Sequence, residues 1–467
     1  MLRVVLLLLI LGVELSATAQ QRWDAVENSP LATGGRARHD DIRIGASGTG
    51  WLVNTRGQIW RTEDSGLTWD QQLDTNGTYL FRSLAMIDRR NAYAGTVLSG
   101  SSVLFATSDG GDTWTDVSNR ISGTRPAGIC GMSVVNSRVI YGVGAFHGEA
   151  AVIKTTNGGL SWTGTSARPL AQTLVDVHFF DESTGIAVGG DSEQLRGNAV
   201  VLRTEDGGSS WQRVYVSTRK PGIDGEWGWK ITFPTPEVGY VSVETATNGF
   251  GEPAKVLKTT DGGRTWHAIE VTGSVSRAGL QGIGFISAEV GWASGRGVTS
   301  VTTDGGNKWT QLLPWASETQ RDGLGNVTAS PDGQLDGSVN RIVVVSDTLA
   351  VAVGRRVYRL GGVPQSTGIA REAPPDQFVL GDLWPNPSEG EVNLSYRLRE
   401  DARVRIEVID VSGRIWHVVE DARKPAGEYT AAWSGTDASG RRVPAGVYFV
   451  LVDVGLSPEM KQVVLIR

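Results

Sequence analysis

The sequence predicts an all-β protein, a seven-bladed β-propeller followed by a small β-sandwich. Two observations predict the propeller. A nine-residue pattern returns six times at the period of a propeller blade, and a pair of apolar strands returns seven times in step with it. A third observation, the change of composition after Leu360, separates the sandwich from the propeller.

The nine-residue pattern, called the box below, has the same layout in every copy. The copies are RTEDSGLTW from Arg61, ATSDGGDTW from Ala106, KTTNGGLSW from Lys154, RTEDGGSSW from Arg203, KTTDGGRTW from Lys258 and VTTDGGNKW from Val301. Each copy places an acidic or amide residue before a glycine-containing turn and ends in a tryptophan. These pairs are Asp64 and Trp69, Asp109 and Trp114, Asn157 and Trp162, Asp206 and Trp211, Asp261 and Trp266, and Asp304 and Trp309. Successive acidic or amide residues are 43 to 55 residues apart, the length of a four-stranded blade.

Each box is expected to form a hairpin corner. Glycine accepts a positive φ without a Cβ clash, and Asp or Asn bonds its own backbone neighbours, so such pairs between apolar runs indicate tight turns. The tryptophan that follows offers a large apolar face and is predicted to wedge between blades. In the third copy Asn157 replaces the acid, which a turn tolerates but a metal site or catalytic carboxylate does not. The box is therefore predicted to be structural.

The strand pair before each box gives a second count of the blades. Its second strand begins at Gly50, Ala92, Ile140, Gly185, Gly239 and Gly291, and a seventh pair begins at Arg341 without a box after it. The segment Gln21–Val26 matches the strand that follows a box, so it is predicted to supply the missing fourth strand of blade seven. This arrangement closes the ring and leaves no exposed sheet edge.

The chain begins with a predicted secretory signal over residues 1–19, and the propeller is predicted over residues 20–360. Arg3 is followed by the apolar run 4–13 and then by Ala17-Thr18-Ala19, an A-x-A cleavage site. We therefore expect that the protein passes through the periplasm and is secreted to the cell surface or outside the cell. The formal net charge of −6 predicts no nucleic-acid partner, and no later apolar run predicts a transmembrane segment in the mature chain.

No metal or cofactor is predicted. Cys130 is the single cysteine and stands in the apolar run ICGMSVV, so it is expected to be a small buried hydrophobe. The five histidines are scattered, and the sequence contains no HExxH, GxSxG or Walker pattern. Metal-dependent, serine-hydrolase and nucleotide chemistry are thus not indicated.

The composition changes after the last predicted blade. Residues 361–377 are rich in Gly, Pro and small polar residues and are predicted to be a linker. Residues 378–467 contain apolar strand patterns divided by Gly, Pro and Asp turns, which predicts a separate sandwich.

The boxes resemble the Asp-box, or bacterial neuraminidase repeat, of the form S/T-x-D-x-G-x-T-W. In the first copy Ser65 replaces the first glycine of the usual pair, and in the sixth copy Lys308 replaces the Thr. Sialidases, xyloglucanases, sortilin ectodomains and the photosystem II assembly factor propellers carry this repeat. In these families the box is distant from the working face, so the resemblance implies the propeller fold and leaves the function open.

Four motifs in the last fifth of the chain carry a second resemblance. They are PNP at 385–387, DVSGR at 410–414, AGVYF at 445–449 and KQV at 461–463. In this order they resemble the immunoglobulin-like domain of the flagellar hook-capping protein and the C-terminal sorting domain of type IX secretion substrates. The resemblance implies an immunoglobulin-like sandwich that interacts with secretion machinery, with Gly446, Tyr448 and Lys461 in the sorting motif. An ordinary accessory sandwich is the alternative.

Ligands of propellers bind where loops meet around the central channel, on the face opposite the box corners, called the loop face below. The most concentrated chemistry in those loops is Glu226, Trp227, Trp229 and Lys230. Two tryptophans beside an acid and a base are suited to stacking on a sugar ring or anchoring a protein. Alternatively, Trp229 is core in an inner strand and Trp227 covers the loop. Further candidates for the same funnel are Phe250, Trp315, Arg125, Arg196 and Glu252.

The sequence favours a non-catalytic binding or scaffold protein whose partner on the loop face is a protein or a glycan. A sialidase needs an arginine triad, and Arg36 and Arg38 lack the apolar flanks of its N-terminal signature. A glycosidase needs two carboxylates at a defined separation. A glycoside hydrolase or sialidase-like carbohydrate-active protein stays the alternative because several loops carry acids: Asp191, Glu193, Asp224, Glu226, Glu244 and Glu252.

Overall fold

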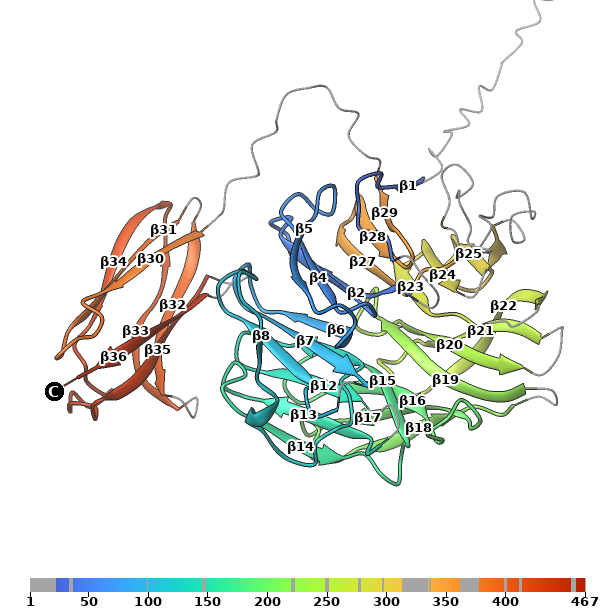
Figure 1. Cartoon of the computed structure of the whole chain (residues 1–467), viewed down its shortest axis with the longest axis horizontal. Coiled ribbons are helices and arrows are strands. Elements are labelled where there is room, and N and C mark those ends of the chain that lie inside the picture. The colour runs from blue at the N-terminus through green and yellow to red at the C-terminus, as the bar shows by residue number, and fades with distance from the viewer. Residues whose placement is uncertain are drawn as a thin grey trace, which may run out of the picture.

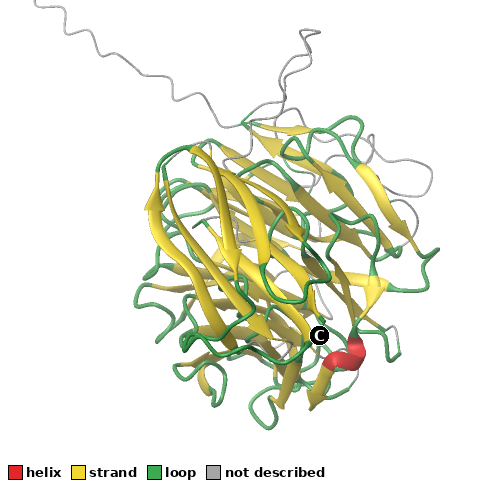
Figure 2. Ribbon diagram, turned by 90° about the vertical axis from the view of Figure 1, so that its left-hand side faces the viewer, coloured by secondary structure: helices red, strands yellow, loops and turns green. Residues whose placement is uncertain are grey.

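The computed structural model describes residues 22–32, 37–98, 100–144, 148–219, 223–247, 252–275, 279–295, 298–312, 335, 337–361, 378–398, 401–410, 414–454 and 459–466. The predicted signal segment 1–19 lies outside these residues, as does the predicted linker after Gly361. The described chain is almost entirely strand and loop (Figure 2). It folds as a seven-bladed β-propeller followed by an immunoglobulin-like β-sandwich, as predicted (Figure 1).

The first six blades are antiparallel sheets whose strands follow one another in sequence. Blade one holds β2 (His39–Ile44), β3 (Gly50–Asn54), β4 (Gln58–Thr62) and β5 (Asp70–Asp74). Blade two holds β6 (Leu80–Met86), β7 (Ala92–Val97), β8 (Leu104–Thr107) and β9 (Thr115–Asp116). Blade three holds β11 (Gly131–Val134), β12 (Ile140–Gly144), β13 (Ala151–Thr155) and β14 (Trp162–Ser166).

Blades four to six repeat this order. Blade four holds β15 (Thr173–Phe179), β16 (Gly185–Gly190), β17 (Ala199–Thr204) and β18 (Gln212–Val216). Blade five holds β19 (Ile223–Thr232), β20 (Gly239–Thr247), β21 (Glu252–Thr259) and β22 (His267–Val275). Blade six holds β23 (Gly282–Phe285), β24 (Gly291–Gly295), β25 (Val298–Thr302) and β26 (Thr310–Gln311). The first strand of each blade is its inner strand, and the box joins the third strand to the fourth.

Blade seven is closed by the N-terminal segment. It holds β27 (Arg341–Ser346), β28 (Leu349–Val353) and β29 (Val357–Leu360), and β1 (Trp23–Ala25) pairs antiparallel with β29 as the fourth strand. Trp23 lies opposite Leu360 in this pairing and belongs to the core between blades six and seven. The predicted closure of the ring by the N-terminus is confirmed.

Blade three differs from the prediction by an additional edge strand. The sequence predicts no strand between blades two and three and places Arg125 of this segment in the loops of the loop face, but β10 (Ile121–Gly123) pairs in parallel with β14. Ile121 packs against the core between blades two and three, and the Ser122 hydroxyl donates to the Trp162 carbonyl oxygen at 3.0 Å. These two contacts hold the segment along the blade edge. The η1 turn (Ser118–Arg120) precedes it.

The boxes form the predicted corners. In blade five the Asp261 carboxylate accepts hydrogen bonds from the Thr259 hydroxyl at 2.7 Å and from the Thr265 amide at 3.0 Å and hydroxyl at 2.6 Å. The Trp266 indole N–H donates to the Gly263 carbonyl at 3.1 Å, while its ring packs with apolar residues of blade four. Gly263 has φ of 81°, which only glycine adopts readily. Each such corner therefore fixes a turn and fills the gap between two blades.

The third box shows that the negative charge is dispensable. The Asn157 side-chain oxygen accepts from the Thr155 hydroxyl at 2.8 Å and from the Ser161 amide at 3.1 Å. Its side-chain N–H donates to the Ser161 hydroxyl at 2.9 Å. In a copy with Asp the hydroxyl donates to the carboxylate instead, so the direction of this one bond is reversed. The network of contacts is otherwise the same.

We predict that Asp206→Asn leaves the stability at pH 7 within about 1 kcal/mol of the original, because exposed charged contacts are screened by solvent. The Ser210 hydroxyl and amide stabilise the ionised carboxylate and lower the pKa of Asp206 to about 2. A lowered folded pKa adds stability above the unfolded pKa of about 3.9, and this part is lost as the pH falls through the folded value.

The variant should therefore lose less stability than the original protein between pH 4 and pH 2, as measured by thermal unfolding at each pH. Trp162→Ala serves as the comparison, because this box tryptophan is 1% exposed and its loss should cost about 3–5 kcal/mol. A large loss of stability at pH 7 in Asp206→Asn would contradict the conclusion that the negative charge of the box is dispensable.

The sandwich consists of two antiparallel sheets that enclose one core. One sheet holds β30 (Phe378–Trp384), β31 (Val392–Leu398) and β34 (Gly427–Trp433). The other has the order β33 (Ile415–Lys424), β32 (Ala402–Asp410), β35 (Gly446–Asp453) and β36 (Glu459–Leu465). Its core includes Tyr396, Ile406, Trp433, Tyr448 and Val463. In the part of the chain that the structure describes, no helix has the length and apolar character of a membrane span.

Candidate functional site

The inner strands bring charged side chains together in the central channel. Asp41, Asp176, Lys230 and Arg341 stand on the inner strands of blades one, four, five and seven, and each is directly followed by an aliphatic residue. All four are buried, with at most 6% of each residue exposed. In three of these strands the pairing register shifts at this point, and a bulge re-aims the side chains there.

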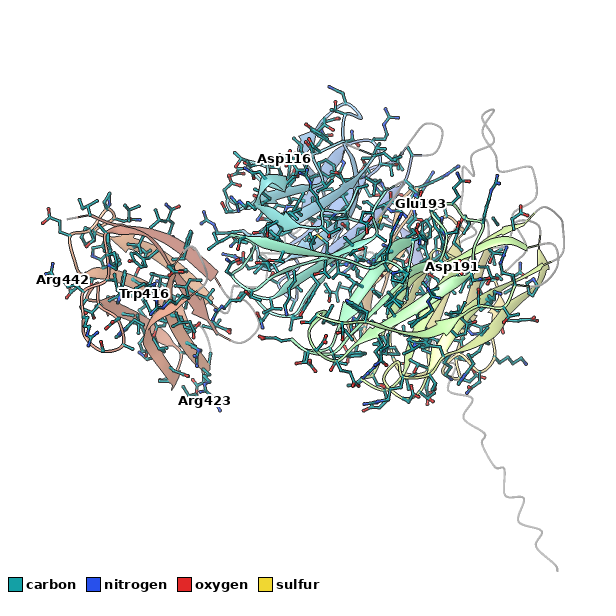
Figure 3. The ribbon with its side chains drawn as sticks, turned by 90° about the horizontal axis from the view of Figure 1, so that it is seen from below. Asp116, Asp191, Glu193, Trp416, Arg423 and Arg442 are labelled. Atoms are coloured by element: carbon teal, nitrogen blue, oxygen red, sulfur yellow. The ribbon has the colours of Figure 1, made fainter. Side chains whose placement is uncertain are left out.

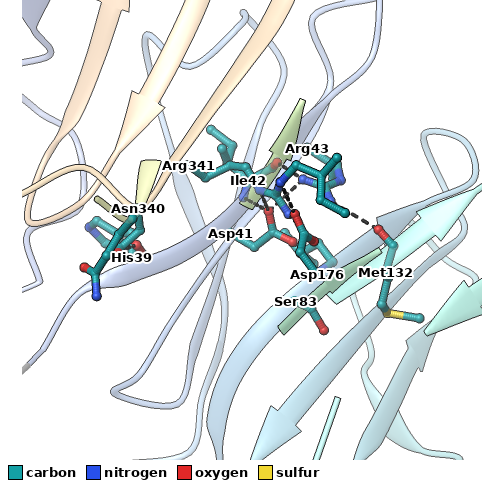
Figure 4. Close-up of polar contacts among 12 residues, drawn as sticks. His39, Asp41, Ile42, Arg43, Ser83, Met132, Asp176, Asn340 and Arg341 are labelled. Atoms are coloured by element: carbon teal, nitrogen blue, oxygen red, sulfur yellow. Dashed lines mark hydrogen bonds and ion pairs between the residues drawn. The ribbon is translucent and has the colours of Figure 1, made fainter. Parts of the chain in front are cut away.

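Arg341 joins the opposite sides of the channel. Its Nε lies 2.9 Å from a carboxylate oxygen of Asp41, and its two terminal nitrogens each lie 3.0 Å from an oxygen of Asp176 (Figure 4). Arg43 approaches the same Asp41 oxygen at 2.6 Å. Burial alone would raise the pKa of Asp41, but the charges of Arg341 and Arg43 outweigh it and lower the pKa to about 2. Both carboxylates are therefore ionised and committed to ion pairs.

The same two carboxylates also bind neighbouring blades through the backbone. The Leu84 amide of blade two donates to Asp41 at 2.9 Å, and the Ile231 amide of blade five donates to Asp176 at 3.0 Å. Each carboxylate thus joins its own blade to the next one in the ring. Because hydrogen bonds to charged groups are stronger than neutral ones, the cluster is suited to holding the blades together.

A second layer of the channel surrounds the Trp229 ring. The guanidinium carbons of Arg82 and Arg38 lie 4.7 Å and 5.6 Å from the centre of that ring. Asp40 accepts from Arg38 at 2.8 Å and from Arg82 at 3.0 Å. Arg38 also donates to the Gln281 side chain at 3.4 Å. Arg38 and Arg82 therefore both lie over the Trp229 ring of blade five, and Arg38 connects this group to Gln281 beside blade six.

The structure places four of the predicted site residues together on β19, and all four are buried. Glu226 is 0% exposed and forms an ion pair with Lys255. Trp227 packs beside the backbone of Gly190 and stacks on Trp229 with the ring centres 6.4 Å apart. Lys230 is 1% exposed. These residues form the channel wall of blade five.

The other candidates lie apart from this group or are not described. Arg125 is half-buried next to Asp116 of blade two, which Figure 3 labels. Arg196 is exposed in the loop between β16 and β17. Glu252 begins β21, and Phe250 and Trp315 lie outside the described residues.

Sequence reasoning missed the ion cluster of the channel. A signal was present, because a charged residue directly precedes an isoleucine in the inner-strand segments DDIRI, WKITF and NRIVV. In a single strand, such a charged residue fits the usual alternation of polar and apolar side chains. The charged residues of different blades come together only when the blades close into a ring. Among the described residues, no group of three His, Cys, Asp or Glu side chains is arranged to hold a metal ion.

The motif residues of the sandwich lie on its last two strands. Gly446 stands opposite Leu465, and Lys461 stands opposite Val450. Tyr448 is 4% exposed and its hydroxyl donates to the Pro444 carbonyl at 2.8 Å. The tyrosine ring thus belongs to the core, whereas the lysine is half-buried.

The PNP motif holds the terminal strand β36 from its open side. The Asn386 side chain accepts from the Val464 amide at 2.9 Å and donates to the Gln462 carbonyl at 2.8 Å. The Ser388 amide donates to the Val464 carbonyl at 2.9 Å, and the Ile466 amide donates to the Ser388 carbonyl at 2.8 Å. Three of the four motifs found in the sequence therefore converge on the last strand.

Comparison with known proteins supports both parts of the fold. Residues 15–166 match the family described as photosynthesis system II assembly factor YCF48, and residues 382–455 match the FlgD Ig-like domain. Each match spans less than half of the chain. No curated protein to which the sequence was compared matches it significantly.

Three solved structures resemble the chain at low sequence identity. YCF48 bound to a D1 peptide is 17% identical with a TM-score of 0.49, covering 74% of this chain and 98% of that one. A GH74 enzyme of Niastella koreensis is 15% identical with a TM-score of 0.49, covering 94% and 74%. The extracellular domain of BT4673 from B. thetaiotaomicron is 10% identical with a TM-score of 0.51, covering 81% and 46%. At these identities the likeness concerns the fold alone.

Proposed function

We propose that the propeller is a non-catalytic binding or scaffold module of the cell surface, and that the sandwich is its export signal. The observation that carries the first part is that five described carboxylates are held by groups of the protein itself: Asp41 and Asp176 in the channel, and Asp191, Glu193 and Glu226 in or beside the loop face. Hydrolysis of a glycosidic bond needs two carboxylates facing the substrate. Here the buried channel acids Asp41 and Asp176 join neighbouring blades instead.

Three of the acidic residues predicted as candidates are also held by other groups of the protein. Glu226 is fully buried and paired with Lys255. Asp191 accepts from the Asn198 amide at 2.6 Å and from its side chain at 2.9 Å, which shapes the β16–β17 loop. Glu193 pairs with Arg168. These contacts support a rigid loop rather than an acid and a base poised on a substrate.

The β16–β17 loop also has a fixed position on the loop face. The Glu226 amide donates to the Gly197 carbonyl at 2.9 Å, and Gly225 leaves no room for a side chain beside the backbone of Leu195 and Arg196. The loop is thereby fixed on blade five, with Glu193 and Arg196 exposed. Figure 3 shows Asp191 and Glu193 of this loop on the propeller. Fixed loops with exposed polar groups are where scaffolds carry binding residues.

Binding is tested with a matched pair of exposed arginine variants, Arg196→Ala on the loop face and Arg264→Ala at a box corner. The full chain is applied to a glycan array and to an array of cell-surface proteins of the same organism. We expect saturable binding that Arg196→Ala weakens about fivefold or more, roughly 1 kcal/mol, while Arg264→Ala does not. Equal binding by both variants, or weakening by Arg264→Ala alone, would contradict a site on the loop face.

The second part of the proposal rests on the arrangement of the sandwich motifs. The PNP segment, the strand that carries Tyr448 and the strand that carries Lys461 form one unit at the C-terminal strand. A short terminal strand held in a fixed position is a suitable recognition element for an export machinery. We expect this unit to act as the sorting signal of a type IX-like route.

Export is tested by fractionating the native host. We predict that Lys461→Ala, and a chain that ends at residue 361, accumulate in the periplasm, whereas the full chain reaches the surface. Arg423→Ala is the control, because Arg423 is an exposed residue of the same sheet on the opposite edge strand (Figure 3). Equal surface delivery of the full and the shortened chain would reject the sorting role, whatever the outcome of the binding experiment.

A further inference from the structure

The channel gathers five basic side chains against three carboxylates. The cations of Arg82, Lys230 and Arg341 are buried, as are the carboxylates of Asp40, Asp41 and Asp176. The side chains of the other two cations, Arg38 and Arg43, are 23% and 24% exposed. The nearby pair of Glu226 and Lys255 is neutral as a unit. With Arg38 and Arg43 included, the region carries an excess of positive charge, and uncompensated charge is costly where water has little access, so a counter-charge is favoured.

Several donors in the same region have no partner. Among the described residues no acceptor lies within hydrogen-bonding distance of Lys230 Nζ, Arg82 Nε, Gln281 Nε2 or Trp229 Nε1. Each of these residues is at most 5% exposed, so bulk water does not solvate these groups freely. Buried donors in native proteins are nearly always bonded. A ligand that accepts hydrogen bonds is therefore expected among them.

These donors face a common part of the channel. Arg82 lies over the Trp229 ring, and Arg38 reaches from that ring to Gln281. Lys230 follows Trp229 in the chain, and its charge interacts with those of Arg341, Asp176, Asp41 and Arg82. Burial lowers the pKa of Lys230 to about 8, which leaves the ammonium charged at neutral pH.

We propose that the channel binds a small inorganic anion of the halide class, with Lys230 Nζ as its principal ligand and the Arg82 side chain beside it. An anion accepts from these donors and also reduces the excess of positive charge, whereas water satisfies only the donors. The surrounding side chains are almost fully buried, which favours a monatomic ion over a bulky one. The site adds to the binding function proposed above and does not depend on it.

The test is thermal unfolding of the full chain at constant ionic strength while gluconate is replaced by chloride or bromide. We expect a saturable rise in Tm of about 2–4 °C, as for a ligand that binds only the folded state. Lys230→Met should abolish this rise. Lys258→Met should keep it, because Lys258 bonds the Gly305 carbonyl at 2.7 Å outside the channel.

A second measurement covers the case in which Lys230→Met does not fold. Crystals of the unmodified chain grown in bromide should show an anomalous peak next to Lys230 Nζ. The proposal is overturned if chloride and gluconate give the same Tm, if the folded Lys230→Met protein keeps the full rise, or if no anomalous peak lies near Lys230.

Discussion

Replacing Trp23 by alanine is expected to destabilise the propeller by about 3–5 kcal/mol, the usual cost of emptying a large aromatic site in a core. Trp23 is 2% exposed, and its ring meets that of Trp292 edge to face with the centres 5.3 Å apart. It also anchors the strand that closes blade seven on Leu360. The free energy of unfolding in denaturant, followed by tryptophan fluorescence, measures the effect.

Deleting residues 22–26 should have at least as large an effect and should also promote aggregation, because it leaves β29 with an unpaired edge. Trp384→Ala is the matched control, since Trp384 lies in the sandwich and is 45% exposed. An unchanged unfolding transition in the shortened chain would contradict closure of the ring by the N-terminus.

Replacing Arg341 by methionine is expected to cost about 3–5 kcal/mol, because it leaves the buried carboxylates of Asp41 and Asp176 without their shared cation. The matched control is Arg397→Met, which removes an exposed ion pair with Glu428 and should cost less than about 1 kcal/mol. Adding Asp176→Asn to Arg341→Met should recover part of the loss, because Asp176 then carries no buried charge that has lost its arginine. Equal, small effects of the two arginine variants would contradict the role of the cluster.

The Arg341→Met substitution should also change how the stability of the protein depends on pH. In the unaltered protein the pKa of both carboxyls is lowered, so their contribution is present at neutral pH and is lost in acid. Without the guanidinium, burial raises the pKa of Asp176, which is then tolerated better when protonated, whereas Arg43 still pairs with Asp41 at 2.6 Å. The stability of the variant relative to the original should therefore increase from pH 7 to pH 4, as unfolding curves at the two pH values measure.

The propeller and its closure could be predicted because their signals are local and repeated. A box fixes a turn within nine residues, so Asp261 and Trp266 can be interpreted without knowledge of the rest of the chain. The match of the segment around Trp23 to a strand after a box is equally local. The strand at Ile121 was missed because its burial depends on the neighbouring Trp162 strand and not on its own sequence.

The channel could not be predicted because its contacts join distant blades. Arg341 and Asp176 are 165 residues apart, and neither forms a motif with its own neighbours. The prediction recognised Trp227, Trp229 and Lys230 as unusual but left open whether they line a ligand funnel or whether Trp229 is core and Trp227 covers the loop. The bulge in β19 and the close packing on Gly190 bury them in the channel wall. Likewise, the bond between Asn386 and Val464 spans 78 residues and appears only in the folded sandwich.

Turnover of a panel of fluorogenic glycosides by the purified full chain tests the proposed non-catalytic function most directly. The panel includes sialosides and β-glucan-type substrates and is run with the unmodified chain and with Glu226→Gln. If the carboxylates serve to hold the fold, hydrolysis will equal the buffer blank for every substrate with both proteins. Turnover by the unmodified chain that disappears in a folded Glu226→Gln protein would contradict the account and identify the propeller as a glycoside hydrolase.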